Sequence, residues 1–302
     1  MARQIETRDI PRIRELLQRV LGVEDYTQLE RLGGLTNRTY KTTLENGEIY
    51  VVRIPGEGTG DMICRADEKI STTLACSLGV DAPLLYFGDG GEKVSRYIPK
   101  AQTLCAAALQ EPERIAQAAE LLRRVHTCGI DTKVPFQVFS MAESYEGIIK
   151  KKGVPMYADY PEIKEAVAAI RQSLPEPALV PCHNDPLCEN WVQGADKLYL
   201  LDWEYAGMND PMWDLADVSI EAGYTQTQDN QLLESYLQRK PTGEEQRRFL
   251  ANKIYVDYLW TLWAKTRVPY DGQPMEDWAA ERYARLKGFL AEFGRLEAAV
   301  CR

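Results

Sequence analysis

Three side chains in the second half of the chain have the types and the spacing that phosphoryl transfer requires. Asp185 ends the triplet H-N-D, Asn190 follows five residues later, and Asp202 lies near the end of the apolar segment 198–203 (LYLLDW). One carboxylate can orient the proton of an attacking hydroxyl, while an amide oxygen and a second carboxylate can hold magnesium ions on phosphates. The pattern therefore predicts a magnesium-dependent transfer of a phosphoryl group.

Each of these residues also has an ordinary structural explanation when it is taken alone. Asp and Asn are common turn formers, and an Asp at the end of a strand is commonly a solvated terminus. Their order favours catalysis, because the protein-kinase pattern H-R-D-x-x-x-x-N followed by D-F-G has here the form H-N-D-x-x-x-x-N followed by D-W-E.

The elements that position these residues begin with a small antiparallel sheet. Gly22 follows a predicted helix, Asn46-Gly47 is a hairpin signal, and Pro99 breaks the pattern after the last predicted strand. The hydrophobic pattern predicts helices over 11–21 and 64–78, and strands over 40–44, 49–54, 84–87 and 93–98. The sequence thus predicts a β-rich lobe over residues 1–98.

The remainder of the chain, residues 99–302, is predicted to be a larger and mainly helical lobe. One short buried strand over 198–203 is the exception. The predicted helices cover 103–109, 112–128, 140–150, 161–173, 229–238, 243–266 and 275–299. This order of elements is typical of an α+β protein with two lobes.

Composition excludes several classes of function. The 302 residues contain 36 Lys and Arg against 45 Asp and Glu, which leaves a formal charge of −9 and argues against a nucleic-acid-binding surface. No apolar run is long enough to span a membrane, and the N-terminal residues contain no apolar signal core, so we expect a cytoplasmic protein. The seven cysteines form no C-x-x-C pair, and with only two histidines a His-rich zinc site is not expected.

Several longer motifs resemble the choline/ethanolamine kinase family, in particular its bacterial choline kinases. They are HND-x-x-x-x-N with LLDWEYAGMNDPMWDLA, GGLTNRTYK, VVRIPG, SRYI and YLWTLWAKTR, and they cover most of 25–270. The resemblance implies a bilobal protein-kinase-like fold, related to the aminoglycoside phosphotransferases, in which the N-terminal lobe binds the nucleotide. It also implies ATP and Mg²⁺ as cofactor and metal.

The resemblance assigns roles to individual residues of this chain. It makes Asp185 the catalytic base and makes Asn190 and Asp202 the magnesium ligands, whereas His183 and Asp214 would support the catalytic loop. Paired glycines also let backbone N–H groups approach phosphate oxygens, although taken alone they are more typical of a plain hairpin turn. The implied nucleotide-binding residues are Gly33, Gly34, Leu35, Thr36, Asn37, Arg53, its partner Glu68, and the hinge residues Tyr97 and Ile98.

The same resemblance indicates how the acceptor is recognised. A quaternary ammonium donates no hydrogen bond, and aromatic faces with a nearby carboxylate bind it. Trp260 and Trp263 lie three residues apart and share a helix face, although such a pair is also typical of a helical core. The resemblance places both tryptophans around the choline headgroup, together with Tyr205 and Glu221.

The sequence therefore predicts an ATP- and magnesium-dependent kinase that phosphorylates the hydroxyl of choline. The alternatives are a kinase of another small alcohol, such as ethanolamine, an aminoglycoside or a sugar, and a catalytically silent protein that binds a nucleotide or choline. Intact Asp185, Asn190 and Asp202 argue against the silent protein.

Overall fold

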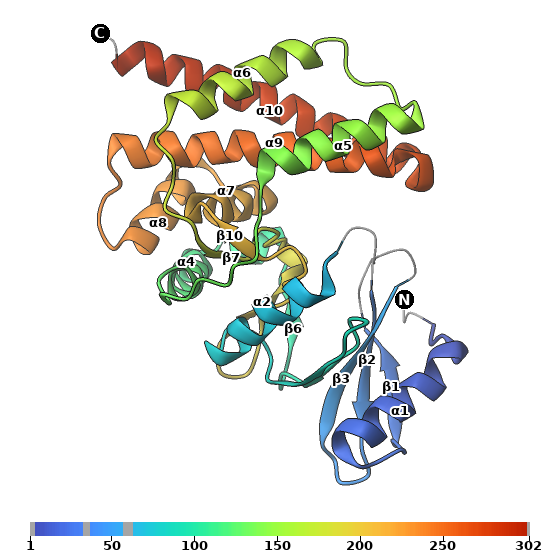
Figure 1. Cartoon of the computed structure of the whole chain (residues 1–302). Coiled ribbons are helices and arrows are strands. Elements are labelled where there is room, and N and C mark those ends of the chain that lie inside the picture. The colour runs from blue at the N-terminus through green and yellow to red at the C-terminus, as the bar shows by residue number, and fades with distance from the viewer. Residues whose placement is uncertain (1–3, 33–36, 57–62, 301–302) are drawn as a thin grey trace. The chain divides into compact units, whose positions relative to one another are not determined.

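The computed structural model describes residues 4–32, 37–56 and 63–300 (Figure 1). Contacts between Cα atoms divide the chain into two compact units. Unit 1 comprises Met1–Cys105, Thr132–Val134 and Cys188–Gly207, and unit 2 comprises Ala106–Asp131, Pro135–Leu187 and Met208–Arg302. The predicted division into lobes 1–98 and 99–302 stays a prediction, and it differs from these units in leaving residues 99–105, 132–134 and 188–207 out of the first lobe.

Unit 1 is built on a five-stranded antiparallel sheet with the strand order β1-β2-β3-β5-β4. Helix α1 packs its apolar residues Ile13, Leu16 and Leu17 in one buried cluster with Tyr40 and Val52 of the sheet. The elements are η1 (Thr7–Asp9), α1 (Ile10–Leu21), β1 (Gln28–Arg31), β2 (Asn37–Thr43), β3 (Ile49–Pro55), α2 (Arg65–Ser77), β4 (Leu84–Phe87) and β5 (Lys93–Arg96).

A second, three-stranded sheet completes unit 1. Its order is β6-β8-β9, formed by β6 (Gln102–Thr103), β8 (Trp191–Gln193) and β9 (Leu198–Leu200). Val192 and Tyr199 of this sheet share a buried cluster with Ala82 and Ile98. This packing explains why residues 188–207 belong to the same compact unit as the N-terminal strands, although they are distant from them in sequence.

Unit 2 is mainly helical. Helix α9 packs against α5, α7 and α10, and α4 packs against α8 (Figure 1). A two-stranded sheet pairs β7 with β10. The elements are α3 (Ala106–Leu109), α4 (Pro112–His126), α5 (Val138–Lys152), α6 (Tyr160–Ser173), β7 (Val180–Cys182), β10 (Gly207–Asn209), α7 (Pro211–Ala222), α8 (Gln226–Leu237), α9 (Gly243–Asp271) and α10 (Gln273–Val300).

The structure confirms the α+β class and corrects several details. Strands β1, β6, β7, β8 and β10 were not predicted, so 198–203 is not the one strand after residue 98. Helix α7 was not predicted, because almost all of its residues are buried and the sequence therefore shows no apolar stripe. The strand predicted over 198–203 ends at Leu200, since Asp202 has a positive φ of 69° that a strand cannot contain.

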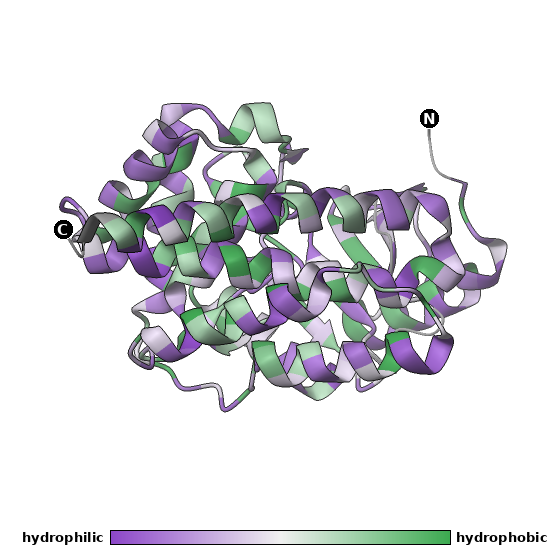
Figure 2. Cartoon of the chain, turned by 90° about the horizontal axis from the view of Figure 1, so that it is seen from above, coloured by the Kyte–Doolittle hydropathy of each residue, from purple (hydrophilic) through white to green (hydrophobic). Residues whose placement is uncertain are grey.

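Across the part of the chain that the structure describes, no helix combines the length and the apolar character needed to cross a membrane. Figure 2 shows hydrophilic and hydrophobic residues mixed along the helices.

Candidate active site

The hairpin of β8 and β9 brings Asn190 and Asp202 together in unit 1. Trp191 pairs with Leu200 in the hairpin, and just beyond this pair the Leu201 N–H donates to the Asn190 carbonyl over 2.9 Å. The two predicted metal ligands thus lie at the same open end of one hairpin. The left-handed backbone at Asp202, which Asp tolerates better than most residues, turns the chain immediately after the strand.

Two further carboxylates lie beside Asp202. Glu68, Asp202 and Glu204 each offer one oxygen, and these oxygens all lie within 4.8 Å of one another. Burial and the nearby charge of Asp202 raise the pKa of Glu204 to about 7. Such a concentration of negative charge is the donor set that a hard divalent cation such as Mg²⁺ prefers. The residues present therefore fit a magnesium ion.

A buried ion pair joins this cluster to the sheet. Arg53 lies on β3, and its Nη1 is 2.5 Å from Oε1 of Glu68 on α2, with side chains that are 5% and 0% exposed. The same Nη1 is 3.7 Å from Oδ1 of Asp202, and Nη2 donates to the Gly91 carbonyl over 2.9 Å. Burial alone would raise the pKa of Glu68, but Arg53 and Arg65 outweigh burial and hold it below its usual value.

The predicted phosphate-covering turn is described only at its last residue. Gly33, Gly34, Leu35 and Thr36 lie outside the described residues. Asn37 begins β2, and its Nδ2 donates to Oε2 of Glu204 over 3.0 Å. The end of the predicted turn is therefore tied directly to the carboxylate cluster.

The predicted hinge residues follow strand β5. The Tyr97 N–H donates to the Ile49 carbonyl over 3.1 Å, and the Ile98 carbonyl accepts from the Ala101 N–H over 3.1 Å. These two backbone groups are occupied within unit 1, and the assignment of Tyr97 and Ile98 to adenine binding stays a prediction.

The catalytic loop of unit 2 is held by Asp214, which lies in the first turn of α7. Its Oδ2 accepts from the His183 N–H and its Oδ1 from the Asn184 N–H, both over 2.7 Å. The carboxylate is completely buried. Two short charge-assisted bonds to consecutive backbone N–H groups fix the loop just before Asp185.

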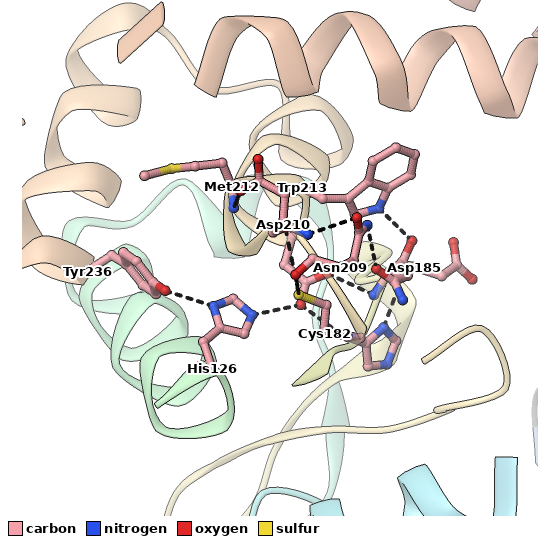
Figure 3. A network of polar contacts seen from close by, with 11 residues as sticks. His126, Cys182, Asp185, Asn209, Asp210, Met212, Trp213 and Tyr236 are labelled. Atoms are coloured by element: carbon pink, nitrogen blue, oxygen red, sulfur yellow. Dashed lines mark hydrogen bonds and ion pairs between the residues drawn. The ribbon is translucent and has the colours of Figure 1, made fainter. Parts of the chain in front are cut away.

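The two histidines of the chain extend this network (Figure 3). Because a carboxylate only accepts, Nε2 of His126 donates to Asp214 over 3.0 Å, and Nδ1 lies 3.0 Å from the Tyr236 hydroxyl. Nδ1 of His183 accepts from the Asp185 N–H over 3.2 Å. Both rings therefore position the loop, as expected for His183.

The left-handed backbone of Asn184 turns the chain immediately before Asp185. Asn184 has a positive φ of 68°, its carbonyl accepts from Nε1 of Trp213 over 3.0 Å, and its Oδ1 accepts from Asn209 over 2.9 Å. Strained backbone of this kind persists where the surrounding bonds over-determine it. In Figure 3 the Asp185 side chain points away from this network, so the network sets the backbone and leaves the carboxylate directed elsewhere.

The predicted aromatic residues form a connected series in unit 2. The rings of Trp260 and Trp263 are 6.2 Å apart and perpendicular, and Trp263 is 6.0 Å from Trp278 of α10. The guanidinium of Arg282 lies 4.1 Å from the centroid of Trp278 and forms an ion pair with Glu221. The structure thus connects Trp260, Trp263 and Glu221 through α10, whereas Tyr205 belongs to unit 1.

Sequence reasoning missed several residues of these clusters. Glu204 was visible as the last letter of D-W-E, and a carboxylate two residues after a metal ligand is a signal that could have identified it. Trp278 and Arg282 lie far along the chain and carry no local signal. Sequence reasoning also missed Tyr145 of α5, which lies within electrostatic reach of Asp185. Burial, and secondarily the charge of Asp185, raises the pKa of the Tyr145 hydroxyl to about 12.

Comparison with known proteins agrees with this geometry. The sequence profile of the family described as choline/ethanolamine kinase matches residues 29–267. The chain is 28% identical over 247 residues to the protein LicA of Haemophilus influenzae, a match that covers 78% of this chain and 92% of LicA. The crystal structure of a choline/ethanolamine kinase family protein from Mesorhizobium loti matches with 33% identity and a TM-score of 0.83, over 96% of this chain and 98% of that one.

The choline kinase LicA from Streptococcus pneumoniae matches with 30% identity and a TM-score of 0.80, over 95% of this chain and 100% of that chain. An aminoglycoside 2'-phosphotransferase, at 16% identity and a TM-score of 0.68, shares the fold alone. The fold and the profile together define a small-molecule kinase with a protein-kinase-like fold. The chain belongs to the choline/ethanolamine kinase family.

Proposed function

We propose that this kinase transfers the γ-phosphoryl group of ATP to the hydroxyl of choline in a magnesium-dependent reaction. The observation that carries the proposal is the carboxylate cluster at the end of the β8–β9 hairpin, where Asp202 lies beside Asn190, Glu68 and Glu204. Similarity to LicA, which has been solved in complex with AMP, supports nucleotide binding.

In this proposal unit 1 binds the magnesium nucleotide. Asp202 and Asn190 would hold the metal, and Glu204, whose carboxylate lies beside Asp202, would add a further ligand. Arg53 supplies a fixed positive charge for the phosphates, because Glu68 and the Gly91 carbonyl hold its guanidinium in place. Bound Mg²⁺ would neutralise the charge that develops on the transferred phosphoryl group.

In the same proposal, residues of unit 2 bind choline, which accepts the phosphoryl group. Asp185 orients the choline hydroxyl and accepts its proton, since the loop before it is fixed by Asp214 and His183. The tryptophan series suits a trimethylammonium group, whose methyl groups are apolar and whose charge is spread. A primary ammonium has three donors that aromatic faces leave unpaired, so we expect choline to be preferred over ethanolamine.

A coupled assay of ADP release tests the function over choline, ethanolamine and a panel of aminoglycosides. We expect the highest kcat/KM with choline, and we expect Asp202→Asn to abolish magnesium-dependent turnover. The exposed carboxylate of Asp196, on the turn of the same hairpin, gives the matched control Asp196→Asn. A preference for an aminoglycoside, or normal turnover in Asp202→Asn, would overturn the proposal.

A further inference from the structure

A second arginine lies beside the carboxylate cluster of unit 1. Arg65 is the first residue of helix α2, and its Nη1 is 2.5 Å from Oε2 of Glu68, which lies about one turn further along the helix. The two oxygens of Glu68 therefore face different guanidinium groups, because Oε1 is 2.5 Å from Nη1 of Arg53. Both arginine side chains are nearly buried, at 9% and 5% exposed, and the proposed function has so far used Arg53 alone.

Arg65 also belongs to a triangle of polar side chains with Asn37 and Glu204. Its Nη1 is 3.6 Å from Oε2 of Glu204, and its Nη2 is 3.5 Å from Oδ1 of Asn37. Nδ2 of Asn37 donates to the same oxygen of Glu204 over 3.0 Å. The triangle therefore joins the start of α2, the first described residue after the predicted phosphate-covering turn, and the carboxylate cluster.

Gly91, in the turn between β4 and β5, leaves the space that the Arg65 side chain occupies. A Cβ atom at Gly91 would lie 2.7 Å from both Cδ and Nε of Arg65, and a φ of 90° is a conformation that glycine adopts readily. The Gly91 carbonyl also accepts from Nη2 of Arg53 over 2.9 Å. Glu68 and Gly91 therefore position both guanidinium groups beside the cluster.

The two carboxylate contacts of Arg65 differ in length. The 2.5 Å contact with Glu68 is a short charge-assisted bond, whereas 3.6 Å to Glu204 is beyond hydrogen-bond distance. Glu204 shares the candidate metal cluster with Asp202, so a divalent cation there would compete with Arg65 for the same carboxylate. A guanidinium that gives up this carboxylate keeps its forked donors, which suit a phosphate group.

We infer that Arg65 balances the charge of Glu204 in the metal-free protein and contacts the β- and γ-phosphates when the magnesium nucleotide binds. The inference rests on the proposed function and adds a second phosphate-binding residue to it. Arg53 would stay fixed between Glu68 and Gly91. Arg65 would stay on Glu68 and exchange Glu204 for phosphate oxygens. It would then favour ATP over AMP, whose single phosphate lies next to the ribose.

The test is a set of calorimetric titrations of the full chain and of Arg65→Gln, with MgATP, AMP and Mn²⁺ alone as ligands. Mn²⁺ is used because it prefers the same oxygen ligands as Mg²⁺. We expect the affinity of Arg65→Gln for MgATP to fall on the order of 10- to 100-fold, while its affinity for AMP changes little. Its affinity for Mn²⁺ without nucleotide should rise, because a cation that competes for Glu204 has been removed.

Two further variants separate this role from a structural one. Arg65→Lys keeps a positive charge and loses the planar fork, so its affinity for MgATP should lie between those of the wild type and Arg65→Gln. Lys69→Gln removes an exposed charge from the same helix and should leave all three affinities unchanged. A residue that only stabilised α2 would instead lower the affinities for MgATP, AMP and Mn²⁺ together.

Equal losses for MgATP and AMP in Arg65→Gln, or an affinity for Mn²⁺ that does not rise, would overturn the inference. If Arg65→Gln does not fold, the contrast between MgATP and AMP must appear at reduced size in Arg65→Lys, and its absence there has the same consequence. If the wild-type protein binds neither nucleotide, the proposed function itself fails, so the two failures are distinguishable.

Discussion

The buried ion pair between Arg53 and Glu68 allows a sharp test of how unit 1 is stabilised. Glu68→Ala removes a carboxylate that is 0% exposed and lies 2.5 Å from Arg53. Removing one member of a buried pair typically costs about 3–5 kcal/mol, because the other charge remains desolvated. Arg53 retains the Gly91 carbonyl at 2.9 Å and Asp202 at 3.7 Å, so we expect a loss near the lower end, about 3 kcal/mol.

Replacing both members should have a different result. A hydrophobic pair of similar volume is often neutral or stabilising, but Arg65, which also contacts Glu68 over 2.5 Å, loses this short contact and keeps the carboxylate of Glu204 at 3.6 Å. Arg53→Met combined with Glu68→Leu should therefore recover stability to within about 2 kcal/mol of the wild type. It should not restore wild-type nucleotide binding, because the double variant lacks Arg53, whose charge is proposed to contact the phosphates.

The assay is a thermal melt of each variant, followed by titration calorimetry with ATP and magnesium. The loss in Glu68→Ala corresponds to a decrease in melting temperature of about 6 °C or more. Lys69→Ala on the same helix is the matched control, since it breaks an exposed pair with Asp89 at 3.6 Å and should cost under about 1 kcal/mol. A double variant as unstable as Glu68→Ala would refute the desolvation argument, and wild-type ATP affinity in the double variant would refute the role of Arg53.

Two further predictions concern unit 2. Asp214→Ala leaves buried donors of His126, His183 and Asn184 without their acceptor. Both the melting temperature and kcat should therefore fall. An unchanged melting temperature would show that Asp214 does not stabilise the catalytic loop. Glu245 closes the capping box of α9, and its hydrogen bond from Arg239 lowers its pKa from 4.5 to about 2. A lowered carboxyl pKa stabilises the fold above pH 4.5, and this stabilisation is lost as the pH falls from 4.5 toward 2. Glu245→Gln should therefore lower the melting temperature at pH 7 more than at pH 3, whereas Glu244→Gln, at the neighbouring exposed position, should change neither.

The sequence predicted those parts of the site that depend on local order. Asn190 and Asp202 were recognisable because a short hairpin separates them and brings its two ends together. The predicted helices of the second half, from 112–128 to 275–299, correspond to helices of the structure, apart from boundaries that shift by a few residues. Amphipathic periodicity is preserved wherever a helix keeps one exposed face.

The rest of the fold and of the site depends on contacts between residues that are distant in the sequence, and no local sequence pattern predicts such contacts. Helix α7 lacked an apolar stripe, although Asp210 before Pro211 and Gly223 after Ala222 are start and stop signals that could have identified it. Arg282 reaches Glu221 across 61 positions of the chain, and this contact arises only when α10 packs on α9. Asp217 of α7 is completely buried, and its carboxylate oxygens have no hydrogen-bond partner among the described residues; this is likewise a result of packing that its neighbours in sequence do not predict.

The most direct test of the central claim follows the reaction by phosphorus NMR, with ATP, choline and the wild-type protein or Asp185→Asn. We predict a phosphocholine signal that requires both magnesium and choline. We also predict that Asp185→Asn forms it at least ~10²-fold more slowly, with unchanged ATP affinity and melting temperature. ADP and inorganic phosphate without phosphocholine, or turnover by Asp185→Asn within a few-fold of the wild type, would contradict the claim.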